Sequence, residues 1–329
     1  MNSGNWKRGL TAFGAALAMV ATAATPSAGA DWPSDTVRII VPWRAGGGTD
    51  LIARAIANAL EKHTGEKAVV VENITAGTGN AGHLAVKDAK PDGLTMLLNG
   101  SSDLNTPVIF RNTPFKLADY TCVGGVFSTP TWALAHKDQG FKDLGDFIKK
   151  AKEKPGELTV GVGSFVSAHY VMAKAIIGRN GINVRVIPFD GGGPLLKAIM
   201  ANQVSMGVIH SPILLSEVKA GKINVLATGG DLSGINYEPV RKTKHIKEWN
   251  TPVEIGVIRG LWVPKATPAT VVAKAEAALE KAAKSPEFAS FGDKFGFKPI
   301  WMGAKAFCDY MAKENAEYRQ IKAEFIDKK

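Results

Sequence analysis

Short apolar runs rich in β-branched residues alternate with segments of helical periodicity along most of the chain. The first run, at residues 37–41, precedes a glycine cluster, after which apolar residues recur at helical spacing over residues 51–60. We predict a strand here, followed by a helix that Thr49 or Asp50 caps and that Gly65 ends.

The same alternation continues to residue 227. The further predicted strands are 68–71, 94–98, 158–162, 184–187, 204–209 and 223–227, and the further helices are 80–89, 143–152, 167–177, 194–201 and 212–220. Strands and helices in this order are typical of a largely parallel sheet with helices on its faces, which is an α/β fold.

Two β-rich stretches, 122–135 and 254–263, interrupt the alternation and can each carry the chain between two lobes. Two C-terminal helices, near 268–283 and 304–325, then complete the first lobe. We predict lobe 1 at residues 31–128 plus 256–329 and lobe 2 at residues 129–255. Two crossing strands between similar lobes form a hinge, and the cleft between such lobes is a favoured ligand site.

The first 30 residues are typical of an export signal. A short basic region, an apolar stretch at 10–24 and the small-x-small motif at 28–30 follow in the order that a signal peptidase requires. An uncleaved membrane anchor is disfavoured because the apolar stretch is shorter than the ~20 residues of a bilayer span. We expect cleavage near Ala30 and a periplasmic location for the mature protein.

Composition and charge narrow the class of protein. Of 329 residues, 45% are hydrophobic and 21% charged, which excludes a disordered or collagen-like chain. The formal net charge is +10, and loss of Lys7 and Arg8 with the signal lowers it by two to +8. No basic run is interleaved with aromatic residues, so we expect no nucleic acid partner. The excess of positive charge either attracts anionic small molecules or is a general property of the surface.

Cysteine, histidine and glycine motifs indicate no cofactor chemistry. The only two cysteines, Cys122 and Cys308, can form a disulfide or remain buried thiols, and spacing does not decide. The six histidines lack the short spacing of metal ligands, so we expect no metal. Residues 77–82 spell G-x-G-x-x-G with Asp103 about twenty residues later, but residues 73–76 lie between the strand and the first glycine, which disfavours a dinucleotide site.

Several segments resemble one family of transport proteins. The opening at residues 32–50, which includes the run VRIIVPWRAGGGTD, resembles the substrate-binding proteins of tripartite tricarboxylate transporters, also called the Bug family. Similar segments follow in the same order at 70–73, 77–80, 91–93, 163–169, 188–192 and 262–264. The resemblance implies a two-lobed, type II periplasmic-binding-protein-like fold. It also implies a non-catalytic, cofactor-free monomer that captures a small organic carboxylate and delivers it to a membrane permease.

The chemistry of these segments agrees with a carboxylate ligand. Free N–H groups at a helix N-terminus are donors for an anion, and glycines let the backbone approach it closely. The residues that we expect to contact the ligand are Trp43, Arg44, Ala45, Gly46, Gly47, Thr49, Asn80, Gly163, Ser164, Ser167, His169 and Asp190. Asp50 is expected to cap the helix or orient its loop, because its negative charge disfavours contact with an anion.

The second lobe is expected to supply the matching half of the site. Ser167 is the predicted N-cap of its helix, Ser164 offers a hydroxyl donor, and His169 in the first turn either contacts the ligand or bonds to its own loop. Two helix starts that grip one carboxylate would couple lobe closure to binding.

Several roles stay open. Asp190 departs from the cationic or amide residue expected there by the resemblance, so it accepts a bond from a ligand amine or hydroxyl, or pairs with Arg44. Arg44 can instead bind a second carboxylate or lie on the surface. An apolar wall for the body of the ligand can be formed by three aromatic residues, Trp43, Phe165 and Phe189. Packing in the core is the alternative for each of them.

Two other functions fit the same pattern. An exported α/β enzyme acting on a carboxylated substrate is one, although the sequence has neither a G-x-S-x-G elbow nor a P-loop. A periplasmic sensor partner that presents its ligand to a signalling receptor is the other.

Overall fold

The computed structural model describes residues 32–65, 67–210, 214–295 and 298–327. The chain divides into Met1–Ala30 and a unit, Asp31–Lys329, that holds every element below. The predicted export signal and its cleavage point lie outside the described residues. Within those residues, no helix is both long and apolar enough to cross a membrane.

The strands form two sheets. Sheet A has the order β11 (Met302–Gly303), β4 (Tyr120–Pro130), β10 (Gly256–Pro264), β3 (Thr95–Gly100), β1 (Val37–Val41) and β2 (Val69–Asn73). Sheet B has the order β7 (Arg185–Pro188), β6 (Thr159–Val162), β8 (Met206–Ile209), β5 (Trp132–His136) and β9 (Ile223–Thr228).

Both sheets are mixed, so the prediction of a largely parallel sheet is wrong. β1 runs parallel to β2 and β3, and β6 runs parallel to β7 and β8. β10 is antiparallel to β3 and β4, and β5 is antiparallel to β8 and β9. The physical reason is connectivity: within β1–β3 and within β6–β8, successive strands are joined through a helix and run parallel, whereas β5 and β10 each enter their sheet from a strand of the other sheet and pair antiparallel.

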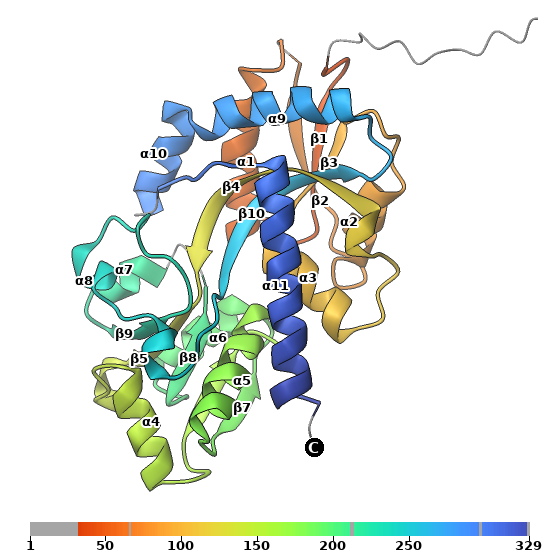
Figure 1. Cartoon of the computed structure of the whole chain (residues 1–329). Coiled ribbons are helices and arrows are strands. Elements are labelled where there is room, and N and C mark those ends of the chain that lie inside the picture. The colour runs from red at the N-terminus through yellow and green to blue at the C-terminus, as the bar shows by residue number, and fades with distance from the viewer. Residues whose placement is uncertain (1–31, 66, 211–213, 296–297, 328–329) are drawn as a thin grey trace, which may run out of the picture. The chain divides into compact units, whose positions relative to one another are not determined.

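β4 and β10 pair along their whole length and lead towards sheet B (Figure 1). Gly256 lies opposite Pro130, and Pro264 lies opposite Tyr120. Beyond Pro130 the chain continues through one residue into β5 of sheet B. The two β-rich stretches therefore form the paired strands that connect the two sheets, which is the arrangement expected of crossing strands in a two-lobed fold.

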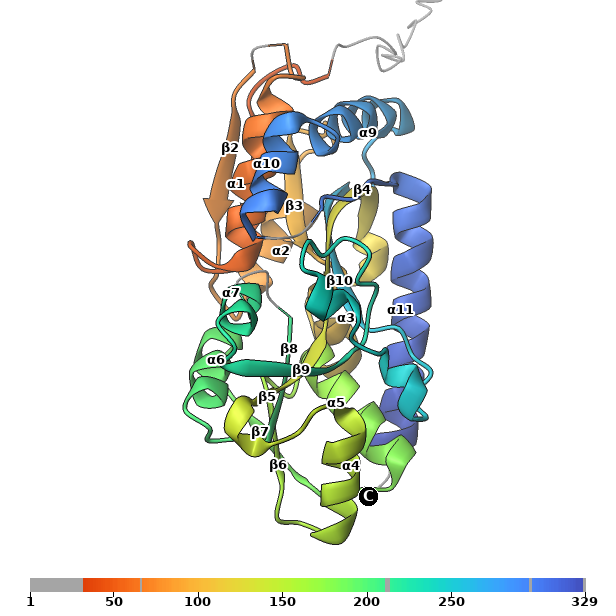
Figure 2. The same cartoon turned by 90° about the vertical axis from the view of Figure 1, so that its left-hand side faces the viewer.

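Helices cover both faces of each sheet. They are α1 (Gly48–Glu61), α2 (Asn80–Lys87), α3 (Ser101–Phe110), α4 (Leu144–Glu153), α5 (Ala168–Asn180), α6 (Gly192–Met200), α7 (Leu214–Lys219), α8 (Glu238–Arg241), α9 (Ala269–Ala283), α10 (Pro286–Phe295) and α11 (Ala304–Phe325), with 3-10 turns at Leu117–Asp119, Lys137–Gln139 and Ile246–Trp249. Helices α9 and α10 pack beside α1 (Figure 2). Neither α3 nor α10 was predicted.

The period-two pattern of β1 explains why both faces are covered. Val37, Ile39 and Val41 are fully buried with α1 and α9, whereas Ile40 is buried in a separate cluster with residues of α2, α3 and α11. Because successive side chains of a strand point to opposite faces, covering both faces makes every residue of β1 apolar except the exposed Arg38.

The N-terminus of α1 differs from the prediction. The helix begins at Gly48 with Gly47 as its N-cap and no side-chain cap, so Thr49 and Asp50 lie inside the first turn. Gly46, with a φ of +80°, turns the chain into the helix, a conformation in which a side chain would be strained. The glycines therefore bring the chain into the helix, and neither polar side chain caps it.

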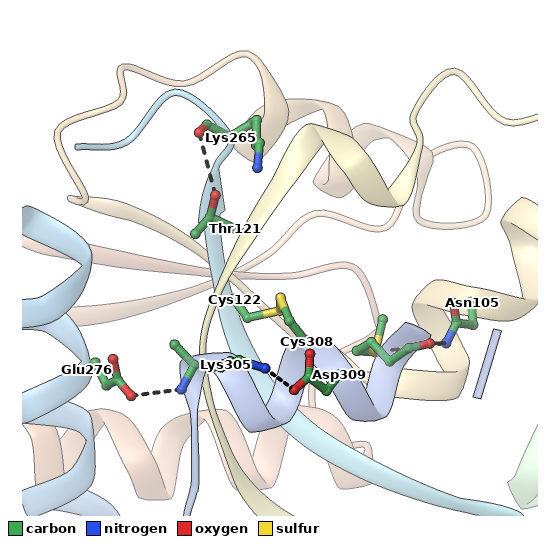
Figure 3. The surroundings of a disulfide bond; sticks show 10 residues. Asn105, Thr121, Cys122, Lys265, Glu276, Lys305, Cys308 and Asp309 are labelled. Atoms are coloured by element: carbon green, nitrogen blue, oxygen red, sulfur yellow. Dashed lines mark hydrogen bonds and ion pairs between the residues drawn. A yellow bond between two sulfur atoms is a disulfide. The ribbon is translucent and has the colours of Figure 1, made fainter. Parts of the chain in front are cut away.

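Helix α11 is attached to both halves of the fold. A disulfide between Cys122 of β4 and Cys308 of α11, with the two Cα atoms 5.9 Å apart, answers the question that spacing left open (Figure 3). Farther along, the Arg179 guanidinium of α5 donates to Glu324 over 2.9 Å. The helix thus contacts β4 of sheet A and also α5, which packs on sheet B.

Candidate functional site

The loop after β1 presents free backbone donors. Ala45, Gly46 and Gly47 are exposed, and the first helical bond of α1 joins the Leu51 N–H to the Gly47 carbonyl. The N–H groups of residues 48–50 therefore precede the helical ladder and have no helical acceptor. These donors and the positive end of the helix dipole make this turn suitable for an anion.

Asp50 holds that loop in place. Its buried carboxylate accepts the Gly46 N–H at 2.8 Å, the Arg54 Nε–H at 3.1 Å and the Asn73 Nδ2–H at 3.0 Å. Burial alone would raise the pKa of Asp50, but the hydrogen bonds from Gly46, Arg54 and Asn73 outweigh it and hold the pKa below its usual value. A carboxylate engaged in this way orients the loop from behind.

Two further predicted residues flank the same turn. Trp43 is 37% exposed, and its indole N–H donates to the buried Asn99 amide oxygen at 2.7 Å. Asn80 is half-buried at the first position of α2, where its N–H donates to the Gly77 carbonyl. Nearby, a Cβ on Gly82 would lie 2.7 Å from a backbone carbonyl and 3.1 Å from Pro42, so the last glycine of the G-x-G-x-x-G run is required for close packing.

A second loop connects β6 to α5. Ser167 is the N-cap of α5, as predicted: its hydroxyl accepts the Tyr170 N–H at 3.2 Å and donates to the Ser164 carbonyl at 2.7 Å. The Ser164 hydroxyl accepts the Val166 N–H, which leaves its own O–H available as a donor. Phe165 is 48% exposed beside Tyr170. This loop therefore offers hydroxyl and backbone donors next to an exposed aromatic ring.

A third loop lies beside the second. The buried Gly163 accepts the Gly191 N–H through its carbonyl at 2.9 Å, which joins the two loops. Asp190 is exposed in this third loop. Among the described residues, neither Asp190 nor Arg44 forms an ion pair, so the possible pair between them is not observed. Both charged side chains are exposed at the surface.

His169 is buried and bonds to another histidine instead of its own loop. Its Nε2 accepts the His210 backbone N–H at 3.2 Å and lies 2.9 Å from the His210 Nδ1. Burial, with a smaller contribution from the charge of Arg259, lowers the pKa of His169 to about 3, so the ring is neutral at pH 7. Because a backbone N–H can only donate, Nε2 is the acceptor and the ring proton lies on Nδ1. That Nδ1–H has no acceptor among the described residues.

Arg259 in β10 was not identified from the sequence. It is 5% exposed, its Nε–H donates to the Thr49 hydroxyl at 3.3 Å, and its Nη2 lies 3.9 Å from Asp103 Oδ2. Its Nη1 has no partner among the described residues. Arg259 also acts electrostatically on His169 and His210, lowering the pKa of both after the larger effect of burial.

Arg259 bonds to one half of the predicted site and acts on the other through its charge alone. It bonds to Thr49 in the first turn of α1, and its charge acts on His169 in the first turn of α5. The sequence held a signal for it: Arg259 is the only charged residue in the fully buried strand GVIRGLWVP. A charge inside an apolar strand indicates either a paired ion or a binding group.

Within the described residues, no group of three or more His, Cys, Asp or Glu side chains could hold a metal ion. The donors at this place are N–H and O–H groups around one buried guanidinium. Chemically, such a set of donors can bind and orient an oxyanion.

Comparison with known proteins gives consistent matches. The family model described as Tripartite tricarboxylate transporter family receptor matches residues 52–325. A UPF0065 protein of Bordetella pertussis is 30% identical over 283 residues, covering 84% of this chain and 85% of that protein.

Solved structures match over most of the chain. A TctC solute binding protein from Polaromonas, solved without ligand, has a TM-score of 0.76 and 25% identity, covering 90% of this chain and 100% of that one. MatC from Rhodopseudomonas palustris, solved with bound malate, has a TM-score of 0.73 and 23% identity, covering 88% and 99%. These matches confirm the predicted two-lobed α/β fold.

Proposed function

Because this chain belongs to the tripartite tricarboxylate transporter receptor family, we propose that it is an exported receptor that captures a small organic carboxylate for a membrane permease. The carboxylate class agrees with the malate bound by MatC. We propose that residues 1–30 are removed during export, that the mature protein works as a periplasmic monomer, and that it catalyses no reaction.

One observation carries this proposal: a buried arginine bonds to the start of α1, and its charge acts on a histidine in the first turn of α5. Thr49 in α1 bonds to Arg259, and the charge of Arg259 reaches His169 in α5. A carboxylate loses its hydration on entering a protein, and several directed donors are needed to offset that loss. The free N–H groups of the two helix starts, the nearby hydroxyls and the guanidinium provide such donors.

Binding is proposed to draw the two lobes together about β4 and β10. A carboxylate that accepts bonds from both helix starts stabilises the arrangement in which these lie close, and this difference in affinity shifts the equilibrium towards the closed state. Helix α11 contacts elements on both sheets, so closure has to preserve or exchange the bond from Arg179 to Glu324. The exposed rings of Trp43 and Phe165 are proposed to contact the body of the ligand.

A thermal-shift screen of organic acids, each paired with its neutral amide, tests the proposal. At a ligand concentration of about 100 Kd, binding to the native state alone adds about 2.7 kcal/mol to the free energy of unfolding. We expect one or more acids to raise the melting temperature and their amides to have no effect. Stabilisation by amides or sugars only would refute the carboxylate assignment.

Two measurements on the acids that bind complete the test. The acid should be recovered unchanged after prolonged incubation, and its turnover would show an exported enzyme instead. Small-angle scattering with and without the acid should show compaction, and identical curves would refute lobe closure.

A further inference from the structure

We propose that Arg259 binds the ligand carboxylate directly through Nη1, assisted by the Nδ1–H of His169. The inference rests on the proposed function for the class of ligand, and it adds the residue that recognises the negative charge. Arg259 lies outside the glycine-rich loop of the family motif, on a strand far along the chain. The assignment rests on the N–H donors of Arg259 and His169 that have no acceptor among the described residues.

Arg259 is a buried cation whose bonds are mostly unmade. A guanidinium has five N–H donors, and burial of its charge is costly unless those donors are paired. Among the described residues, Arg259 has one hydrogen bond, from its Nε–H to Thr49, because the 3.9 Å between Nη2 and the Asp103 carboxylate is an ion-pair distance beyond hydrogen-bond range. The Nη1 atom is buried without an acceptor in the described part of the chain. This geometry leaves a charged N–H donor available for a further acceptor.

The backbone of β10 suits this role. A register shift separates Arg259 from Gly260, where the strand pairs with β4. Irregularities of this kind are common beside functional sites, where they aim a side chain out of the regular ladder. Arg259 lies on one of the two strands that connect the sheets, so its guanidinium can serve both helix starts.

His169 supplies a second, uncharged donor. Its ring is 6% exposed, is held by two contacts with His210, and carries its proton on Nδ1. A Cβ added to Gly163 would lie 2.5 Å from this Nδ1, so the donor lies close beside the second loop and a larger residue there would crowd it. A carboxylate oxygen accepting from this N–H and from Nη1 would satisfy both unused donors at once.

The charges also balance. Asp103 opposes the charge of Arg259, while the N-termini of α1 and α5 each contribute about half a positive charge. A single bound carboxylate is therefore compensated without an additional cation. We accordingly infer that one carboxylate, and not a neutral polar group, occupies this position.

A halide soak tests the site without knowledge of the natural ligand. Crystals of the wild type soaked in sodium bromide should show an anomalous peak within hydrogen-bond distance of Nη1, and crystals of Arg259→Gln should lack it. Bromide bound only elsewhere in the wild type would overturn the proposal.

Calorimetry is the second test. It measures the binding of acetate, benzoate, malate and adipate and compares each acid with its neutral amide. For the acid that binds best, Arg259→Gln should weaken affinity by about 10- to 150-fold, since a hydrogen bond to a charged group contributes about 1.5–3 kcal/mol. Arg259→Lys should weaken it less, because the charge remains but the planar fork is lost. The surface variant Arg319→Gln is the matched control and should bind normally. Acid affinity of Arg259→Gln equal to that of the wild type would refute the assignment.

Asp103→Asn keeps the test decisive if Arg259→Gln fails to fold. Removing the competing carboxylate should strengthen acid binding several-fold, and weaker or unchanged binding would contradict direct contact with Arg259. If no acid binds the wild type, the proposed function fails, while the bromide experiment still decides whether Arg259 binds an anion.

Discussion

Glu314 is expected to make the stability of this protein fall as pH rises. It is buried in α11, where its carboxyl oxygens accept the Ser101 hydroxyl at 3.0 Å and the Asn105 amide at 2.7 Å. Burial raises the pKa of Glu314 from 4.5 to about 8, because the opposing effect of these two hydrogen bonds is smaller. The native protein therefore holds this proton at neutral pH, whereas the unfolded chain releases it.

The sign and the size follow from that difference. The native state binds more protons than the unfolded state between pH 4.5 and about 8, so stability is complete below this window and is lost as pH rises through it. At pH 7 the cost relative to a permanently neutral group is about 3 kcal/mol, since each pKa unit corresponds to about 1.4 kcal/mol. Glu314→Gln retains the shape and stays neutral, so it should remove this cost.

Urea unfolding at pH 5, 6, 7 and 8, followed by circular dichroism, measures the effect. The free energy of unfolding of Glu314→Gln minus that of the wild type should increase steadily from pH 5 to pH 8. The histidines affect both proteins equally and cancel in this difference. Glu280→Gln, at a surface carboxylate that pairs with Lys284, is the control and should follow the wild type. A difference that stays constant with pH would refute the reasoning.

Three further outcomes are expected. Thr49→Val should weaken acid binding about 10-fold or more in calorimetry, because it removes a hydroxyl donor and leaves a guanidinium N–H unpaired. Thr49→Ser should retain binding. Equal affinities of Thr49→Val and the wild type would show that this hydroxyl is not part of the site. Replacing Cys122 and Cys308 together by alanine should lower the free energy of unfolding in urea by about 2–5 kcal/mol, since the bond spans 186 residues, and an unchanged midpoint would contradict this. Gly163→Ala should lower the free energy of unfolding by about 1–3 kcal/mol, because its Cβ would lie 2.5 Å from a buried imidazole nitrogen. Gly193→Ala is the control, since a Cβ there has nothing within 4 Å. Equal stabilities of the two variants would show that the imidazole moves aside.

Much of the secondary structure was predictable from local pattern. The predicted bounds of β1 and α11 match the structure at both ends, because a run rich in β-branched residues and a long helical repeat report local preference and burial together. Helix α3 was missed: its polar first turn and internal Pro107 disfavour a helix. It forms because α11 satisfies its polar side chains, as the bonds from Ser101 and Asn105 to Glu314 show.

The candidate site was predictable in part for the same reason. The glycine turn before α1 and the serine cap of α5 are local motifs, so residues near them could be proposed from spacing. Arg259 could not, although its isolation in an apolar strand was visible. Its importance depends on Thr49 lying beside it, a partner 210 positions away in the chain.

By itself the amino-acid order determined the alternation of strands and helices, the two connecting strands and the donor-rich helix starts, because each arises from interactions between near neighbours. Only the tertiary structure decided the mixed direction of the sheets, the disulfide, the neutral state of His169 and the unused donors of Arg259. Each of these depends on desolvation and on contacts between distant segments, which arise only when the folded chain brings those segments together.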